Sequence, residues 1–227
     1  QGGMSLLLEV DKSKLGPAEA KNAVDQAIQI ITNRIDQFGV AEPSIQQQGD
    51  NRILIQLPGV QDPERAKALI GKTALLEFKL VDEGASVDDA LKGNLPEDSQ
   101  VLYQKTADPS TGRVTKTPIL VKKRALLTGD TIKSAKVSFG GQAGGAYVSI
   151  SFDSRGSKVF DRVTAENVKR RLAIVLDDTV YSAPVIQERI SGGEAQITGS
   201  FTMEEATDLA IVLRAGALPA PVVILEE

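Results

Sequence analysis

Apolar and polar residues alternate most clearly between residues 43 and 60, where two short extended runs flank a turn. Residues 53–57 read Ile-Leu-Ile-Gln-Leu, which predicts a strand with one fully apolar face. Gly49-Asp50-Asn51 is typical of a hairpin turn that requires positive φ. Pro58-Gly59 ends the strand because proline has no N–H to donate. The pattern predicts the central β-hairpin of a sheet.

Two helices are predicted from the spacing of apolar residues. Pro17 suits the first turn of a helix, where its missing N–H costs nothing, and Gly39 suits the C-terminal end. Between them, apolar residues recur every three or four positions, at Val24, Ile28, Ile31, Ile35 and Phe38. Asp62-Pro63 opens a second, short helix that Gly71 closes. The first helix therefore presents an apolar stripe to the sheet.

Strands before and after these helices complete the first predicted domain. The apolar run Ser5–Val10 precedes the first helix, and the alternating residues 74–80 follow the second. The order is βαββαβ, the ferredoxin-like arrangement of an α+β protein. Residues 82–124 hold loop-forming residues with little periodicity, so we expect an irregular connection there.

A second α+β block is predicted to start near Leu126. Alternating residues flank the glycine-rich segment 140–145 as a hairpin, and apolar spacing predicts a helix over 159–168. Further strands are expected at 172–176, 180–186 and 195–198. Pro184 places the strand 180–186 at a sheet edge, because proline cannot donate to a neighbouring strand.

The C-terminal segment repeats the helix–strand layout of residues 62–81. Thr202 and Glu205 form a capping box before a helix, and residues 222–225 form a strand. We expect this pair to return to the first sheet. The predicted domains are a base, residues 1–124 with 200–227, and an inserted head, residues 125–199.

Composition excludes several classes of function. The 227 residues carry a formal net charge of −4, which argues against a basic nucleic-acid-binding face, and residues 52–57 lack the aromatic side chains that stack on RNA bases. The absence of histidine and cysteine removes Ser-His-Asp, Cys-His and imidazole-based zinc sites. No apolar run reaches the length of about 18 residues that spans a bilayer. The start at Gln1 indicates a piece of a longer protein.

Short motifs predict no catalytic or metal site. Gly71-Lys72-Thr73 resembles the end of a P-loop, but it ends a predicted helix, whereas a phosphate cradle precedes one. The segment 140–145 joins two strands and lacks a following Lys-Ser/Thr. Neighbouring side chains diverge on strands and on helices, so turn and capping roles are expected for the paired carboxylates. These pairs lie at 88–89, 177–178 and 204–205.

A resemblance spread along the chain is more informative than these motifs. Residues 39–60, which read GVAEPSIQQQGDNRILIQLPGV, resemble the signature stretch of the SecD family of protein translocase subunits. The opening residues 1–11 are similar to the segment that follows the first transmembrane helix in that family. Further similar stretches lie at 173–178, 181–186 and 199–206, so the resemblance covers essentially the whole chain.

The resemblance implies the first large extracytoplasmic domain of a membrane-tethered subunit, on the periplasmic side of the cell inner membrane. It implies a non-enzymatic role without a cofactor, in which SecD works with SecF beside the SecYEG channel and uses the proton-motive force. A ferredoxin-like base and an inserted head are expected. The head would hold the emerging unfolded preprotein and move relative to the base. The family's proton-carrying residues lie in membrane helices outside this chain.

Two sets of residues are candidates for these roles. An expected edge strand suits an unfolded chain, which offers apolar side chains and unpaired backbone, although an ordinary packed strand is the alternative. The candidate preprotein contacts on that strand are Tyr181, Pro184, Val185 and Ile186. Gly129 and Gly199 flank the expected insertion and are the candidate hinge, with simple turns as the alternative.

A second class of function stays open. Porter domains and small-molecule-binding regulatory domains can share the split βαβ layout. Such a domain needs a lined ligand pocket, for which an aromatic content of 4% provides little material. A free-standing enzyme is a third class, which the missing histidine disfavours.

Overall fold

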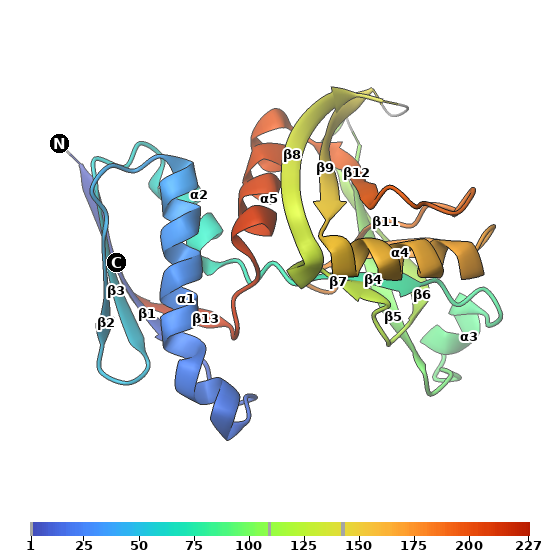
Figure 1. The fold of residues 1–227 in the computed structure, drawn as a ribbon, viewed down its shortest axis with the longest axis horizontal. Helices are drawn as coiled ribbons and strands as arrows, with labels where there is room; N and C mark the ends of the chain where they lie inside the picture. Colours follow the sequence, from blue (N-terminus) through green and yellow to red (C-terminus); the bar gives the residue numbers. More distant parts are fainter. Residues whose placement is uncertain (1, 109, 142–143) are drawn as a thin grey trace. The chain divides into compact units, whose positions relative to one another are not determined.

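The computed structural model describes residues 2–108, 110–141 and 144–227, which form two compact units (Figure 1). The first unit combines both ends of the chain, Gln1–Ala74 and Ile211–Glu227, and the second is Leu75–Ala210. The chain therefore passes between the units at 74/75 and at 210/211. These boundaries differ from the expected 124/125 and 199/200 because the residues after 75 build strands of the second unit.

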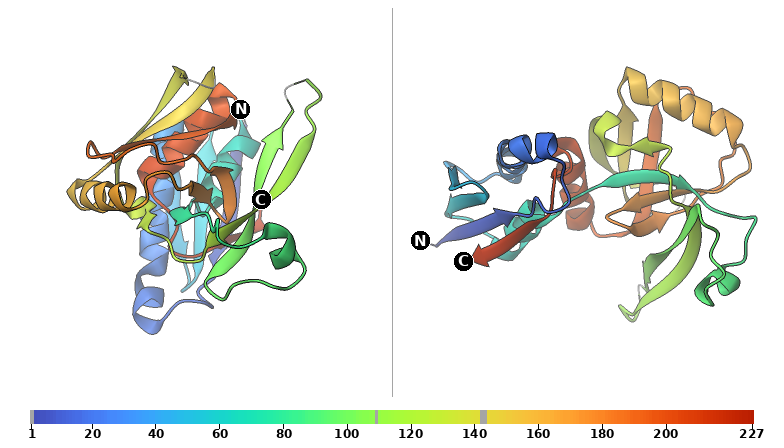
Figure 2. Two further views of the ribbon diagram at one scale, coloured as in Figure 1. Left: turned by 90° about the vertical axis from the view of Figure 1, so that its right-hand side faces the viewer. Right: turned by 90° about the horizontal axis from the view of Figure 1, so that it is seen from below.

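The first unit is a four-stranded antiparallel sheet with two helices on one face (Figure 1). Its elements are β1 (Gly3–Val10), α1 (Pro17–Phe38), β2 (Ser44–Gln48), β3 (Arg52–Pro58), α2 (Pro63–Gly71) and β13 (Val222–Glu226). The strand order is β13-β1-β3-β2. The first and last strands of the chain therefore lie side by side (Figure 2).

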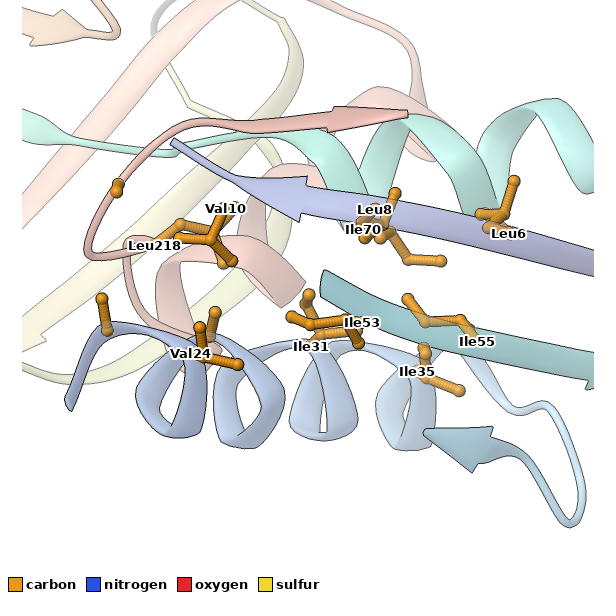
Figure 3. Packing of buried hydrophobic residues seen from close by; sticks show 14 of the residues in the cluster. Leu6, Leu8, Val10, Val24, Ile31, Ile35, Ile53, Ile55, Ile70 and Leu218 are labelled. Carbon is orange, nitrogen blue, oxygen red and sulfur yellow. The ribbon is translucent and has the colours of Figure 1, made fainter. Parts of the chain in front are cut away.

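The predicted helices and hairpin of this unit are confirmed. Helix α1 begins at Pro17 and ends before Gly39, whose φ of 98° is a left-handed conformation that favours glycine. Gly49, in the turn between β2 and β3, likewise has a φ of 66°. Figure 3 shows apolar side chains of α1 facing those of β1 and β3, with Ile31 and Ile53 both fully buried. Each such burial stabilises the fold by about 1.5–3 kcal/mol.

The expectation that residues 74–80 complete the first sheet is wrong. This segment forms β4 (Leu76–Leu80), which pairs antiparallel with β10 (Leu172–Leu176) in the second unit. The place beside β1 is taken by the C-terminal strand β13. With β13 as its last strand, the first unit has the order βαββαβ. The α+β class is confirmed, and the ferredoxin-like base stays an interpretation.

The second unit contains a six-stranded sheet, in the order β6-β5-β11-β10-β4-β7, and a three-stranded sheet, β12-β9-β8. Its elements besides β4 and β10 are α3 (Val87–Leu91), β5 (Ser99–Ala107), β6 (Val114–Lys122), β7 (Leu127–Thr128), η1 (Gly129–Thr131), β8 (Ile132–Gly140), β9 (Gly145–Phe152), α4 (Ser154–Glu166), β11 (Thr179–Ser182) and β12 (Glu194–Phe201). The irregular connection expected over 82–124 is therefore wrong, because α3 and the hairpin β5–β6 lie there.

Three phenylalanine rings join the layers of the second unit. Phe78 of β4, Phe152 of β9 and Phe160 of α4 contact one another with ring centroids 5.1–5.9 Å apart. All three side chains are buried. Such aromatic pairs add to the stabilisation from area burial alone. The core of this unit is thus separate from the core formed by α1 and the first sheet.

Two further predictions concern the ends of these strands. The hairpin β8–β9 is confirmed, while residues 142–143 of its predicted glycine-rich loop lie outside the described residues. The capping box is also confirmed, since the Glu205 amide donates to the Thr202 hydroxyl and the Thr202 amide to the Glu205 carboxylate. It opens α5 (Met203–Ala215), the helix that contains the 210/211 crossing. Among the described residues, no helix has the length and apolar character needed to cross a bilayer.

Candidate functional site

The segment predicted to be an edge strand, residues 180–186, lies inside a sheet over its first part. Its first part is β11, which lies between β10 and β5 in the six-stranded sheet. After β11 the chain remains hydrogen-bonded to its neighbour, since the Leu172 amide donates to the Pro184 carbonyl at 2.9 Å. Pro184 joins this pairing through its carbonyl, which requires no N–H of its own.

The four candidate contact residues differ in exposure. Ile186 is buried, at 6% exposure, and its backbone amide and carbonyl are both hydrogen-bonded. Val185 is 43% exposed, Pro184 is exposed, and Tyr181 is half-buried. Ile186 is therefore a core residue in this structure. Contact of these residues with a preprotein stays a prediction.

Tyr181 belongs to a row of apolar side chains in the second unit. Its ring packs edge-to-face against Phe201, with ring centroids 5.7 Å apart. Phe201 at the end of β12 lies opposite Ala146 of β9, and Phe139 of β8 lies opposite the same alanine on its other side. Opposite residues on antiparallel strands project from one face of a sheet. We call Phe139, Phe201 and Tyr181, with Ala146 between the two phenylalanines, the aromatic row.

The aromatic row is the outer end of an apolar sheet face. Farther along the same face, Val148 lies opposite Val137 and Ile197, and both Val148 and Ile197 are fully buried. At the other end, Phe139 is 71% exposed. A large aromatic ring in water at the end of an apolar sheet face is the type of feature that marks an interaction site.

The two candidate hinge glycines lie inside the second unit, in η1 and β12. A Cβ atom at Gly199 would lie 3.1 Å from the Phe201 ring, and one at Gly129 would lie 3.1 Å from the Leu76 Cβ. Both positions are therefore glycine where another side chain approaches closely. The chain crosses between the units elsewhere, at 74/75 and 210/211. A hinge role for either glycine stays a prediction.

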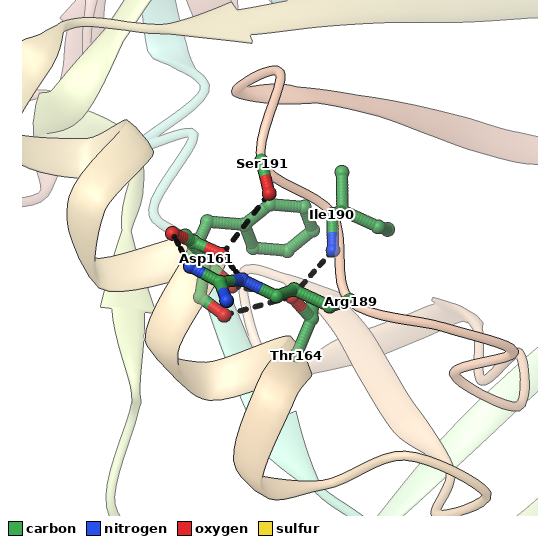
Figure 4. A network of polar contacts seen from close by, with 6 residues as sticks. Asp161, Thr164, Arg189, Ile190 and Ser191 are labelled. Atoms are coloured by element: carbon green, nitrogen blue, oxygen red, sulfur yellow. Dashed lines mark hydrogen bonds and ion pairs between the residues drawn. The ribbon is translucent and has the colours of Figure 1, made fainter.

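Residues 189–191, in the loop between β11 and β12, are hydrogen-bonded to α4 (Figure 4). The Arg189 guanidinium donates two hydrogen bonds to the Asp161 carboxylate, and the Ile190 amide donates to the Thr164 hydroxyl at 2.9 Å. Ser191 also donates to Asp161, at 3.4 Å. These donors, Arg189 above all, hold the pKa of Asp161 below its usual range. The loop is thereby held in one place against the helix.

A second polar cluster joins β4 to the β5–β6 hairpin. The buried Ser99 hydroxyl donates to the Asp82 carboxylate at 2.6 Å, and the Lys122 ammonium lies 3.5 Å from the same group. The Ser99 hydrogen bond is the main reason that the pKa of Asp82 lies below its usual range. This cluster fixes the hairpin through a carboxylate that is itself almost fully covered.

The paired carboxylates have turn and capping roles where the structure shows their contacts. Asp177 and Asp178 both have positive φ in the turn between β10 and β11, and Asp177 accepts from the Leu75 amide at 2.8 Å. Asp88 and Asp89 lie in the first turn of α3, capped by Ser86. Among residues 2–108, 110–141 and 144–227, no cluster of three or more acidic side chains is placed to hold a metal ion.

Sequence reasoning missed Arg34. This arginine is 0% exposed and donates to main-chain carbonyls of Leu69 and Gly216, at 2.9 and 2.8 Å. A signal was present, because position 34 lies three residues after Ile31 and beside Ile35, on the apolar stripe of α1. Phe201 was missed as well, since its neighbours Ala146 and Tyr181 come from other strands.

Two family models match the chain. The model described as "SecDF, P1 head subdomain" matches residues 99–220, and the model described as "Protein translocase subunit SecDF, P1 domain, N-terminal" matches residues 24–83. Among similar curated proteins, "Protein translocase subunit SecD" of Calditerrivibrio nitroreducens is 61% identical over 90% of this chain and 40% of its own length. The subunit of the same name from Syntrophobacter fumaroxidans is 52% identical over 100% of this chain and 42% of its own.

Two solved structures are also similar. One, titled "Structure and function of a membrane component SecDF that enhances protein export", is 37% identical with a TM-score of 0.75, and the match covers 99% of both chains. Another, titled "Crystal structure of SecDF in Super-membrane-facing form", has a TM-score of 0.77 and 38% identity over 99% of this chain and 30% of its own. The chain thus spans about 40% of the length of the curated relatives above. It belongs to the SecD/SecDF family of protein translocase subunits and corresponds to their P1 domain.

Proposed function

We propose that this chain is the periplasmic domain of a protein-export subunit that is anchored in the inner membrane. The domain binds emerging, unfolded preprotein and assists the late stage of translocation, together with SecF and the SecYEG channel. Its role is non-enzymatic. Family membership supports this proposal, and the relative titled a membrane component "that enhances protein export" points to the same process.

The aromatic row is the observation that carries the preprotein-binding part of the proposal. An unfolded chain differs from a folded protein in exposing many apolar side chains. Phe139, 71% exposed, lies on the same sheet face as Phe201, and the Phe201 ring packs against the half-buried Tyr181. Aromatic rings provide a large contact area at low entropy cost, because they have few rotatable bonds. Such a surface suits many different apolar segments rather than one sequence, as an export subunit requires.

The division of the chain supports the part of the proposal that concerns motion. Within the part of the chain that the structure describes, no strand pairing joins the sheet of the first unit to those of the second, each unit has its own buried core, and the chain passes between them at two points. Rigid bodies joined by a few connecting residues are the structural basis of hinge movement. We propose that the second unit acts as the head and moves relative to the first, and that the proton-motive force drives this movement through parts of the protein outside this chain.

The proposal is tested by measuring how tightly the 227-residue chain binds a fluorescently labelled, unfolded polypeptide. The polypeptide does not need to be a secretory protein. Phe139→Ala should weaken the binding by about tenfold, because a buried aromatic contact contributes about 1–2 kcal/mol. Leu91→Ala is the matched control, since Leu91 of α3 is also an exposed apolar residue, at 51%. Equal affinities for wild type and both variants, measured by fluorescence anisotropy, would contradict the assignment of the aromatic row.

A small-molecule-binding role has less support in the structure. The apolar cavity in the first unit, lined by Ile35, Phe38 and Leu57 among others, has a volume of about 10 Å³. Drug-sized ligands occupy largely enclosed, mostly apolar pockets of about 300–1,000 Å³, whereas the hollows of about 400–540 Å³ in this unit are open and lined in part by polar side chains. That cavity therefore gives no reason to prefer a porter or regulatory domain.

A further inference from the structure

The buried guanidinium of Arg34 binds the C-terminal ends of two helices. Toward α2, it donates to the carbonyls of Leu69 at 2.9 Å and Lys72 at 2.5 Å. Toward α5, it donates to the carbonyl of Gly216 at 2.8 Å. The last carbonyls of a helix lack intrahelical partners and carry partial negative charge. An arginine with five N–H donors suits two such ends at once.

These carbonyls lie next to the points where the chain leaves and re-enters the first unit. Lys72 and Thr73 come directly before the 74/75 crossing, and Gly216 directly follows the helix that contains the 210/211 crossing. The Leu218 amide also donates to the Thr73 carbonyl, at 2.9 Å, and Arg34 lies 3.4 Å from that same oxygen. Arg34 therefore ties the outgoing and the returning segment together inside the first unit.

At the 74/75 crossing, the residues on either side of Ala74 are held by hydrogen bonds. Ala74 has a φ of 62°, a left-handed conformation that is uncommon for residues other than glycine. The next residue, Leu75, is held by the second unit, because its amide donates to the Asp177 carboxylate at 2.8 Å and its carbonyl accepts from the Asp177 amide at 3.0 Å. Anchored residues thus stand on both sides of Ala74.

We propose that Arg34 is a positioning residue that fixes both chain crossings in the first unit and thereby limits the range of movement of the second unit. This inference rests on the proposed function, in which the second unit moves as a head. A purely structural role would stabilise the first unit without affecting the movement. The two roles differ in what happens when Arg34 is replaced in a protein that remains folded.

Distances between spin labels distinguish the two roles. The chain contains no cysteine, so labels can be placed on Gln29→Cys in α1 and Lys158→Cys in α4, both exposed positions. Arg34→Met and Arg34→Lys are compared with Ile31→Ala, a core truncation in the same helix that leaves the carbonyl contacts in place. Lysine keeps the charge but has no planar fork with which to bind both helix ends. It also provides a second variant if Arg34→Met fails to fold.

We expect both Arg34 variants to broaden the distance distribution, whereas Ile31→Ala keeps the wild-type width. Exchange of the Leu218 amide with solvent should also become at least about tenfold faster in the Arg34 variants, relative to amides of β1. A wild-type width in a folded Arg34→Lys protein would overturn the proposal, and faster Leu218 exchange with that width would show a purely structural role. Polypeptide binding by the aromatic row is measured separately, so failure of the proposed function is distinguishable from failure of this inference.

Discussion

The guanidinium of Arg34 lies 2.8 Å from the carbonyl oxygen of Gly216, a residue 182 positions later in the chain. Both residues belong to the first unit, and the whole second unit is inserted between them. This contact, with the β1–β13 pairing, joins the two chain segments that make up the first unit. The integrity of that unit therefore depends on a buried cation as well as on its apolar core.

Replacement of Arg34 by methionine should destabilise the first unit by about 3 kcal/mol, because several buried carbonyls lose a charged donor. Arg52→Met provides the matched control. The Arg52 side chain is 53% exposed and pairs with Glu9 at the surface, where ion pairs contribute little. Urea unfolding followed by amide exchange of β1 and β3 measures both effects. Equal effects of the two substitutions would contradict the role assigned to Arg34.

The pH dependence of stability should change when Asp82 is replaced by asparagine. The pKa of Asp82 is lowered in the folded state, so its carboxylate stabilises the fold above the unfolded-state pKa of about 3.9. This contribution is lost as the pH falls through the lower, folded-state pKa. The difference in unfolding free energy between wild type and Asp82→Asn should therefore shrink below about pH 4.

Tyrosine fluorescence measures this difference because Tyr103, Tyr147 and Tyr181 all lie in the second unit with Asp82. Asp98→Asn is the control, since Asp98 contacts the same Lys122 but its side chain is 71% exposed. A difference for Asp82→Asn that stays constant from neutral to acid pH would show that the Ser99 hydrogen bond does not lower its pKa.

Gly156→Ala should destabilise the second unit despite the higher helix propensity of alanine. A Cβ atom at Gly156 would lie 2.6 Å from the Thr131 Cβ, and Thr131 is itself buried. The expected cost of this overlap, about 1–3 kcal/mol, exceeds the propensity gain of about 1 kcal/mol. Gly145→Ala is the control, because a Cβ there meets no atom within 4 Å. Unfolding midpoints followed by tyrosine fluorescence should fall for Gly156→Ala alone.

Local patterns in the sequence predicted the elements that depend on near neighbours. Helix α1, the β2–β3 hairpin and the Thr202–Glu205 capping box are specified by residues within one or two turns of each other. The sheet to which a strand belongs is a different matter. β4 and β13 have similar apolar content. β4 pairs with β10 and β13 pairs with β1, and each of these partners is distant in sequence. The pattern within residues 74–80 contains no information about that choice.

The local sequence pattern predicts neither the hairpin β5–β6 nor the aromatic row. The first half of β6, residues 114–117, is exposed and carries threonine and lysine, so alternation of burial is absent there. The aromatic row collects one aromatic side chain from each of β8, β11 and β12, with Ala146 of β9 between two of them. The sequence singles out Tyr181 only through its place in a predicted edge strand. The structure gives a different reason to single it out, its contact with Phe201.

Photo-crosslinking to a secretory protein stalled in transit tests whether the second unit binds preprotein. A photoreactive residue is placed at Phe139, at Tyr181 or at Gln29 of the intact membrane protein, with Gln29 as the exposed control on α1 of the first unit. We expect strong crosslinks from Phe139 and Tyr181 and weak ones from Gln29. Crosslinks from Gln29 alone, or from none of the three, would contradict the assignment of preprotein binding to the second unit.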